Sequence, residues 1–241
     1  GVLSHDPRPS YQRSPERVYG LSFAGYDIRF TVEENILTVK EVLKDSKVRV
    51  EELTDTVFAH ASDTKTPQGI LCVVEQMNHE INELTSAKCP LIMVLDHLQD
   101  PGNLGTMIRT GEGAGITGVI MNNQTVDIFN PKTIRATMGS IFRVPIVYVP
   151  DLAPVLEQMH AKGIYTYAAH LKGQEYYDSF SFREPTAFLI GNEGNGLSKE
   201  ISDQAGQYLK IPMEGRVESL NASIAAALLM YEAHRQRSAR L

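Results

Sequence analysis

The sequence predicts an α/β protein whose larger, C-terminal part is a parallel β-sheet covered by helices on both faces. Three observations lead to this fold class. From Pro90 onward, short apolar segments of strand type alternate with helical segments, as they do in parallel sheets. Three polar turns each follow an apolar strand, where such sheets bind their ligands. The residues before Pro90 lack this alternation and predict a smaller, separate α/β unit.

The N-terminal part is expected to form a small domain over residues 18–75, after an irregular lead-in at 1–17 that is rich in Pro, Arg and Ser. A polar segment at 76–89 predicts a linker to a second domain at 90–241. Within the small domain, apolar spacing predicts a helix over 31–43, a strand over 48–53, a helix start over 54–62 and a strand over 70–74.

In the second domain, the alternation of apolar and polar segments sets the expected elements. Strands are predicted over 91–95, 119–121, 145–149, 164–168, 187–190 and 208–211. Helices are predicted over 104–114, 131–138, 152–162, 198–205 and 219–237. Pro131 at a first helical turn and Gly163 just after a last turn fit helix starts and ends.

The composition, 42% hydrophobic and 22% charged, is that of a soluble globular protein. No apolar run approaches the roughly 18 residues of a membrane span, and the first residues lack the apolar core of a signal peptide. Cys72 and Cys89 have no paired metal or redox spacing. These features predict a reducing, cytoplasmic location without a membrane partner.

The net charge of −6 does not by itself favour a nucleic-acid partner. Residues 1–85 hold nine Lys and Arg against fourteen Asp and Glu, whereas residues 86–241 hold fourteen against fifteen. The acidic excess therefore lies in the N-terminal third. A polyanion would be met by local basic patches of the C-terminal part.

The first polar turn is Asp100-Pro101-Gly102-Asn103-Leu104-Gly105, with Arg109 behind it. Its spacing alone favours a tight connection in which Asn103 caps the following helix and Arg109 is solvated or ion-paired. The placement of Arg109 on the first turns of a helix that begins at a strand's carboxyl end favours a functional site instead.

The second turn, Gly191-Asn192-Glu193-Gly194-Asn195-Gly196, follows the apolar run 188–190. Its glycines allow a ligand to approach the backbone closely. No Lys-Ser/Thr pair follows, so it is not a Walker loop, and it lacks the helix register of a dinucleotide fingerprint. A plain turn remains an alternative, but Glu193 among glycines has little packing purpose.

The third turn, Ser219-Leu220-Asn221-Ala222-Ser223, opens the longest predicted helix. Capping by Ser219 or Asn221 would explain it, and so would a site at the helix start. The spacing of Leu220, Ile224, Leu228 and Tyr231 predicts the apolar stripe that packs this helix into the core. Arg235, Arg237 and Arg240 suit the negative end of the helix.

Two other site classes are not supported. The seven histidines form no i, i+4 pair and no cluster flanked by carboxylates, so no metal site is expected. A serine hydrolase is not expected either, because the chain has no G-x-S-x-G elbow.

Taken together, the three turns resemble the motifs of the SpoU-type (TrmH-like) RNA 2′-O-ribose methyltransferases of the SPOUT class. Motif one is carried by residues 100–110, motif two by 191–197, and motif three by 211–213 with 218–223. The resemblance covers about residues 88–237 and includes the order and rough separation of all three motifs.

This resemblance implies a chain threaded into a deep trefoil knot, a pocket for S-adenosylmethionine, and a homodimer in which both subunits shape each active site. The N-terminal unit resembles the L30e-like substrate-binding domain of the family through residues 64–70. Carried over by motif, the residues of the cofactor pocket are Leu189, Gly191, Asn192, Ile211, Met213 and Leu220.

The implied reaction transfers a methyl group to a ribose 2′-OH of structured RNA, with ribosomal RNA favoured over transfer RNA by the two-domain layout. The implied catalytic residues are Arg109, Asn103, Glu193, Ser219 and Asn221. A guanidinium with a pKa above roughly 12 is a very weak base. Arg109 is therefore expected to orient the hydroxyl and its neighbouring phosphate and to stabilise alkoxide charge.

Three alternatives stay open: a transfer RNA 2′-O-methyltransferase, a non-catalytic RNA- or cofactor-binding relative, and a nucleotide-binding α/β enzyme with coincidental glycine loops. A pure binding protein would have no need of Arg109, Glu193 and Asn221 together, which argues against the second alternative.

Overall fold

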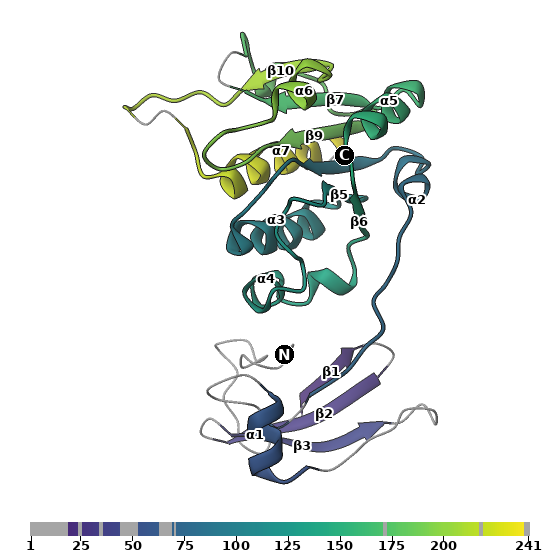
Figure 1. The fold of residues 1–241 in the computed structure, drawn as a ribbon, viewed down its shortest axis with the longest axis vertical. Helices are drawn as coiled ribbons and strands as arrows, with labels where there is room; N and C mark the ends of the chain where they lie inside the picture. Colours follow the sequence, from purple (N-terminus) through teal and green to yellow (C-terminus); the bar gives the residue numbers. More distant parts are fainter. Residues whose placement is uncertain are drawn as a thin grey trace. The chain divides into compact units, whose positions relative to one another are not determined.

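The structure is a computed structural model. It describes residues 19–23, 26–33, 36–43, 53–62, 69, 71–170, 173–216 and 219–238, with only the backbone described for the first three ranges. The chain divides into two compact units, Gly1–Gln76 and Met77–Leu241 (Figure 1).

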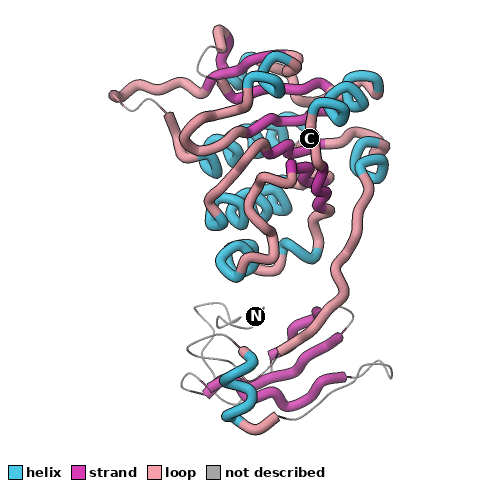
Figure 2. Tube along the Cα trace, viewed as in Figure 1, coloured by secondary structure: helices cyan, strands magenta, loops and turns pink. Residues whose placement is uncertain are grey.

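The N-terminal unit contains three antiparallel strands in the order β1-β2-β3 (Figure 2). They are β1 (Tyr19–Phe23), β2 (Tyr26–Glu33) and β3 (Ile36–Leu43), followed by helix α1 (Asp55–Ala61). The helix expected over 31–43 is therefore wrong. Six of the thirteen residues in this stretch are β-branched and favour strands over helices, although the apolar spacing also fits a helical period.

Two further predictions for this unit have mixed outcomes. The helix start predicted over 54–62 is confirmed by α1. The strand predicted over 70–74 is wrong, because residues 71–74 have no regular structure and pair with no other strand. The lead-in at 1–17, residues 48–52 and residue 70 lie outside the described residues, and the L30e-like fold stays a prediction.

The C-terminal unit is built on a seven-stranded sheet in the order β6-β5-β4-β9-β7-β10-β8, in which neighbouring strands are parallel. This confirms the predicted parallel α/β architecture. The strands are β4 (Leu91–Leu95), β5 (Gly118–Asn122), β6 (Ile146–Val149), β7 (Tyr165–Ala169), β8 (Glu175–Tyr176), β9 (Thr186–Ile190) and β10 (Gln207–Lys210).

The five helices predicted in this part are present, with bounds within a few residues of those expected. The helices are α2 (Ile81–Thr85), α3 (Pro101–Ala114), α4 (Pro131–Thr137), α5 (Ala153–Ala161), α6 (Lys199–Asp203) and α7 (Ala222–Arg237), with short 3-10 turns η1 (Ser140–Phe142) and η2 (Tyr177–Ser179). Helix α2 was not predicted. It lies in the expected linker, yet its Leu84 is buried in the core.

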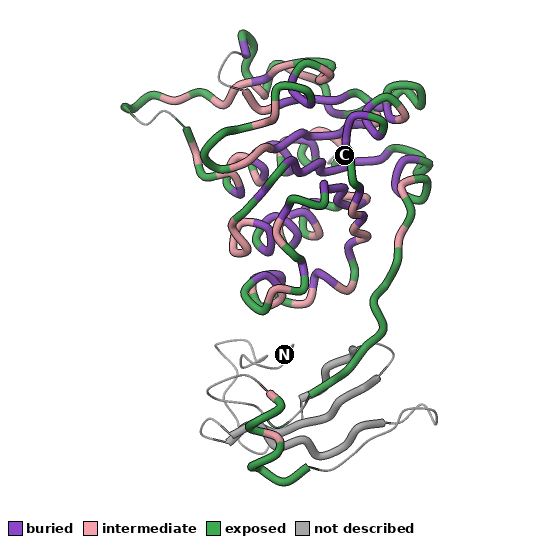
Figure 3. The backbone as a smooth tube through the Cα atoms, in the orientation of Figure 1, coloured by how far each residue is buried: buried purple, intermediate pink, exposed green. Residues whose placement is uncertain are grey.

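The sheet separates two apolar clusters, one on each face. Figure 3 shows the buried residues of this unit along its strands and helices. Alternate residues of β4 divide between them, with Met93 in the cluster that includes α3 and α7, and Val94 in the cluster that includes α5. This alternation follows from the two-residue period of a strand. Because both faces are covered, the β4 and β9 strands are fully buried, and polar groups gather at the strand ends.

Helix α7 packs with a face that differs from the predicted stripe. Its buried residues are Ser223, Ala226, Leu229, Met230 and Ala233. Ile224, Leu228 and Tyr231 are instead 50%, 37% and 48% exposed. The apolar spacing identified a real stripe but assigned it to the wrong face, because small residues fit the close contact between α7 and α3 better than large ones.

Candidate active site

The first polar turn starts helix α3 through Asp100. Its side chain caps the helix by accepting a hydrogen bond from the Asn103 backbone N–H at 2.8 Å, and Pro101 occupies the first turn. The expected cap at Asn103 is therefore wrong. Since Asp100 fills this role, the Asn103 side-chain amide is available for other contacts. Gly105 allows α4 to pack closely, because an added Cβ would lie 2.5 Å from the Ala136 Cβ.

Glu193 joins the second turn to the first. Its carboxylate accepts hydrogen bonds from the backbone N–H groups of Gln99 (3.1 Å) and Asp100 (3.0 Å) and from the Asn103 side-chain amide (3.0 Å). Burial alone would raise the pKa of Glu193, but the hydrogen bonds from Asn103, its own N–H, Asp100 and Gln99 together lower it. Glu193 thus acts as a charged clamp on the start of α3.

Asn103 also contacts the third turn. The Asn221 side-chain amide donates to Asn103 Oδ1 at 2.9 Å. The Asn221 Oδ1 in turn caps α7 by accepting from the Ser223 and Ile224 backbone N–H groups at 2.8 and 3.4 Å. A continuous chain Glu193–Asn103–Asn221 therefore brings together three turns that are distant in sequence.

The glycine-rich turn itself is a closed loop. The Asn192 and Gly196 backbones bond each other in both directions at 2.9 Å. Asn192 Oδ1 accepts from the Gly194 and Asn195 N–H groups at 2.9 and 3.0 Å. Gly191 is required by close approach, since an added Cβ would lie 2.1 Å from the Gly196 carbonyl carbon.

This loop forms one wall of a cavity of about 320 Å³ at the carboxyl ends of β7, β9 and β10. Five of the six residues predicted for the cofactor pocket line it, as do Glu193 and Ser219 from the predicted catalytic set. The five are Gly191, Asn192, Ile211, Met213 and Leu220. Leu189 does not line the cavity, because it is fully buried within β9.

Sequence reasoning missed two polar residues of the cavity wall, His170 and Lys210. His170 follows β7 and stacks on Tyr208 with ring centroids 4.9 Å apart. Lys210 ends β10 and places its ammonium 4.9 Å from the centre of the Tyr176 ring. Both stand at the carboxyl ends of strands, so the rule for ligand sites in parallel sheets could have identified them.

Arg109 lies elsewhere on the same helix. It is exposed, it does not line the cavity, and within the described part of the chain it makes no hydrogen bond or ion pair. It stands six residues after Asn103, about 9 Å along the helix axis at about 1.5 Å per residue, and so in the third turn of α3 rather than the first. Beyond it, Gly113 faces the Tyr231 hydroxyl, which an added Cβ would approach to 3.1 Å.

Two kinds of feature do not occur among the residues that the structure describes. No three His, Cys, Asp or Glu side chains there stand close enough to hold a metal ion. Likewise, none of the helices there combines the length and apolar character that crossing a membrane requires.

Family models match both parts of the chain. The model of the SpoU rRNA Methylase family matches residues 90–231, which include all three turns. A model of the TrmO C-terminal domain matches residues 1–45.

Among curated relatives, the chain is 33% identical to the 23S rRNA (guanosine(2553)-2′-O)-methyltransferase RlmP of Bacillus subtilis over 80% of this chain and 79% of that protein. It is 33% identical to the putative TrmH family tRNA/rRNA methyltransferase YacO of the same organism, covering 71% of each.

Solved structures give the same result. An AdoMet-bound rRNA methyltransferase from Sinorhizobium meliloti is 34% identical with a TM-score of 0.69, covering 76% of this chain and 70% of that one. The SpoU methyltransferase AviRb from Streptomyces viridochromogenes, in complex with AdoMet, is 32% identical with a TM-score of 0.64, covering 68% and 64%. The chain thus spans slightly less than two thirds of AviRb. These matches, together with the three turns and the parallel sheet, show that the chain belongs to the SpoU rRNA methylase family.

Proposed function

We propose that this protein transfers a methyl group from S-adenosylmethionine to a ribose 2′-OH of structured RNA, with ribosomal RNA as the preferred substrate. The single observation that carries the proposal is the chain Glu193–Asn103–Asn221, which brings the three motif turns together at the cavity. The name of the RlmP relative, a 23S rRNA 2′-O-methyltransferase, supports the substrate class.

The cavity suits S-adenosylmethionine in size and in lining. Its volume of about 320 Å³ falls in the range of small-molecule sites, roughly 300–1,000 Å³. The side-chain-free wall at Gly191, Gly194 and Gly196 leaves backbone groups open to a ligand. Ile211, Met213 and Leu220 supply an apolar surface for a purine ring. Leu189 would support this wall from within the sheet rather than contact the ligand.

When bound, S-adenosylmethionine supplies a methyl group on a positively charged sulfur. A ribose hydroxyl is a poor nucleophile, so the protein must orient it and stabilise the negative charge that develops on its oxygen. Arg109 is the proposed group for this task, because its guanidinium stays charged and its donors are free of protein partners in the described part. Asn103, Glu193, Ser219 and Asn221 are proposed to hold the site in register.

The position of Arg109 supports a homodimer. Arg109 lies on the exposed face of α3, whose neighbour α7 presents Ile224, Leu228 and Tyr231 to solvent. We define these three residues as the α7 stripe. Contiguous apolar groups of this kind mark interaction surfaces. We propose that a second copy covers the stripe and that both protomers then shape each active site, with Arg109 of one serving the cavity of the other. The trefoil knot, the reading of RNA by the N-terminal domain and the cytoplasmic location belong to the same proposal.

Methyl transfer to RNA tests the function directly. The purified protein is incubated with tritiated S-adenosylmethionine and total RNA from a strain that lacks its gene, and the labelled nucleotide is then mapped. The proposal expects label on a ribose of ribosomal RNA. Label on transfer RNA would correct the substrate, and label on a base would overturn the reaction. Cofactor binding without transfer to any RNA would favour a non-catalytic relative.

A further inference from the structure

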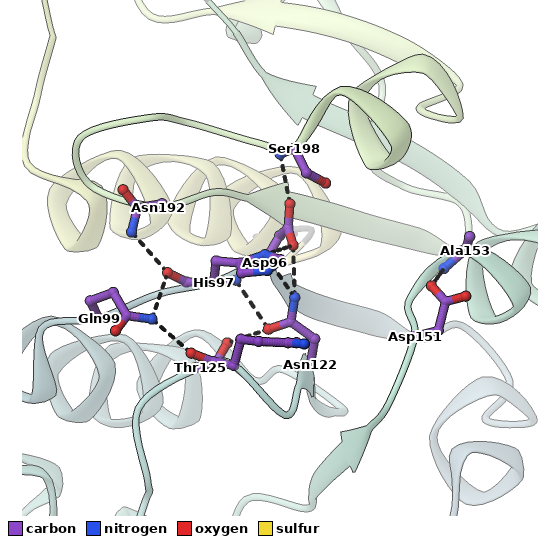
Figure 4. A network of polar contacts seen from close by, with 10 residues as sticks. Asp96, His97, Gln99, Asn122, Thr125, Asp151, Ala153, Asn192 and Ser198 are labelled. Atoms are coloured by element: carbon purple, nitrogen blue, oxygen red, sulfur yellow. Dashed lines mark hydrogen bonds and ion pairs between the residues drawn. The ribbon is translucent and has the colours of Figure 1, made fainter.

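Asp96 is a buried charge that the proposed mechanism does not use. It follows β4, is 1% exposed, and does not line the cavity. Its Oδ1 accepts from the Asn122 side-chain amide at 2.8 Å, and its Oδ2 accepts from the Ser198 backbone N–H at 2.7 Å (Figure 4). The His97 ring nitrogen Nδ1 also lies 2.5 Å from Oδ1. An ionised carboxylate is kept in such a place only when it is fully hydrogen-bonded.

His97 adds a second link at the same point. Its backbone is left-handed, with a φ of 57°, which is uncommon for a residue other than glycine. The Asn122 Oδ1 accepts from the His97 N–H at 3.1 Å. In this conformation the His97 carbonyl accepts from the side-chain amides of Asn192 (2.9 Å) and Gln99 (3.2 Å). Backbone strain held by surrounding contacts often marks a functional site.

These contacts hold both ends of the glycine loop, residues 191–198. Asn192, near its start, bonds the His97 carbonyl, and Ser198, at its end, bonds the Asp96 carboxylate (Figure 4). Between them, Glu193 bonds the start of α3. The loop that forms a wall of the cavity is therefore held at both ends by Asp96 and His97, which do not line the cavity.

We propose that Asp96 is a positioning residue for the cofactor site. By holding Ser198 directly, and Asn192 through the His97 carbonyl, it keeps the glycine loop in the shape that binds S-adenosylmethionine. This inference rests on the proposed function, since it assumes that the cavity holds that cofactor. It predicts that loosening the Asp96 contact weakens cofactor binding more than it slows the chemical step.

The sharpest variant is Ser198→Pro. Ser198 has a φ of −58°, which suits the proline ring. The change removes the N–H that Asp96 accepts and puts the ring Cδ in place of its hydrogen, so the carboxylate must move away from residue 198. Loss of one hydrogen bond to a charged group lowers an equilibrium constant by about ten- to hundredfold. S-Adenosylhomocysteine should bind about tenfold or more weakly by calorimetry. The KM for the cofactor should rise similarly, while kcat at saturating cofactor stays within about twofold.

The matched control is Lys199→Pro, one residue further on. Lys199 is the first residue of α6, where proline is well tolerated, and the Ser198 N–H remains. This variant should bind S-adenosylhomocysteine as the unchanged protein does. Its exposed ion pair with Asp203 contributes little.

A second pair of variants covers the case in which Ser198→Pro does not fold. Asp96→Asn leaves one acceptor oxygen for two donors, so its NH₂ faces either the Asn122 NH₂ or the Ser198 N–H, and binding should weaken. The double variant Asp96→Asn/Asn122→Asp restores a donor and an acceptor there, and should recover part of the lost affinity. Unchanged affinity in Ser198→Pro or Asp96→Asn overturns the inference. A lower melting temperature and a lower kcat, with unchanged affinity for S-adenosylhomocysteine, would overturn the inference as well. If the unchanged protein itself fails to bind S-adenosylhomocysteine, the proposed function fails together with this inference.

Discussion

Helix α3 carries two of the proposed catalytic residues, and their surroundings are opposite. At its start, Asn103 is held on both sides, by Glu193 and by Asn221. Arg109, six residues further along, is exposed and makes no hydrogen bond or ion pair within the described residues. The difference shows how the site divides its tasks. Under the proposed function, the protein fixes in advance the groups beside the cofactor cavity, and the exposed Arg109 is the cation proposed to serve RNA or a partner protomer.

The largest effect is expected from Arg109→Lys, which keeps the charge but removes the forked donors. Loss of a donor that stabilises developing charge lowers kcat by about a hundred- to a thousandfold. Because Arg109 does not line the cavity, the Kd for S-adenosylhomocysteine should not change. Methyl transfer to RNA under saturating cofactor, together with calorimetry, measures the two quantities.

Arg183→Lys is the matched control for this variant. Arg183 is exposed in the segment before β9, at the end of the strand opposite to the site, and its replacement should leave both quantities unchanged. If Arg109→Lys retained a normal kcat, the proposed role of Arg109 would be wrong. An equal loss of cofactor affinity would show instead that the two ends of α3 act as one unit.

The α7 stripe tests whether Arg109 serves a partner protomer. Leu228→Glu would bury an unpaired charge in the proposed dimer, at a cost of about 3 kcal/mol or about a hundredfold in the dimer constant. Light scattering should then report a shift toward the mass of a single chain, 26.7 kDa, with activity falling alongside the dimer fraction.

Tyr165→Glu supplies the comparison for the stripe variant. Tyr165 is 57% exposed at the start of β7, away from α7 in sequence and at the opposite end of the sheet from the site. It should leave the oligomeric state unchanged. A Leu228→Glu protein that elutes and methylates as the unchanged protein does would exclude the stripe as the interface.

Glu193→Gln tests the fixed end of the helix. A glutamine has one acceptor oxygen and an NH₂ group in place of two acceptors, so it cannot receive all three donors from Gln99, Asp100 and Asn103. The expected loss in kcat/KM is about tenfold, in the range of one hydrogen bond to a charged group. Glu157→Gln, exposed on α5, is the control. An unchanged kcat/KM would mean that the Glu193 clamp has no bearing on the reaction.

The sequence predicted the parallel sheet well, because in the C-terminal unit each apolar segment is long enough to cross the core and is bounded by turn residues. It predicted the meeting of the three turns through their resemblance to a known family. The Asp96 network was not foreseen, since Asp96, Asn122 and Ser198 come together only through the pairing of β4 with β5 and β9. No local pattern encodes that pairing.

The errors have a physical pattern as well. The helix predicted over 31–43 and the core stripe on α7 were both read from apolar spacing. Spacing reports which residues share a face, but not whether the segment is a helix when β-branched residues are frequent in it. Nor does it report which face packs when small residues such as Ala226 and Ala233 fill a close helix contact.

The smallest effect expected is an acid dependence of stability at Glu193. Its pKa is lowered in the folded protein, so its contribution is fully present above the unfolded value near 4.5 and is lost as the pH falls through the lower folded value. Glu193 is exposed, so solvent limits the contribution to under about 1 kcal/mol. Urea unfolding should show Glu193→Gln as the less stable protein at pH 7, and the difference should vanish in acid.

Glu112 lies near the other end of α3. A comparison of Glu112→Gln with Glu193→Gln distinguishes an effect on stability from an effect on cofactor binding. Its pKa is also lowered, chiefly by the hydrogen bond from Arg143, so Glu112→Gln should lose stability with the same dependence on pH. Glu112 does not line the cavity, and its variant should bind S-adenosylhomocysteine normally, whereas Glu193→Gln should bind it more weakly. Equal affinities in the two variants would show that the Glu193 carboxylate stabilises the fold without shaping the site.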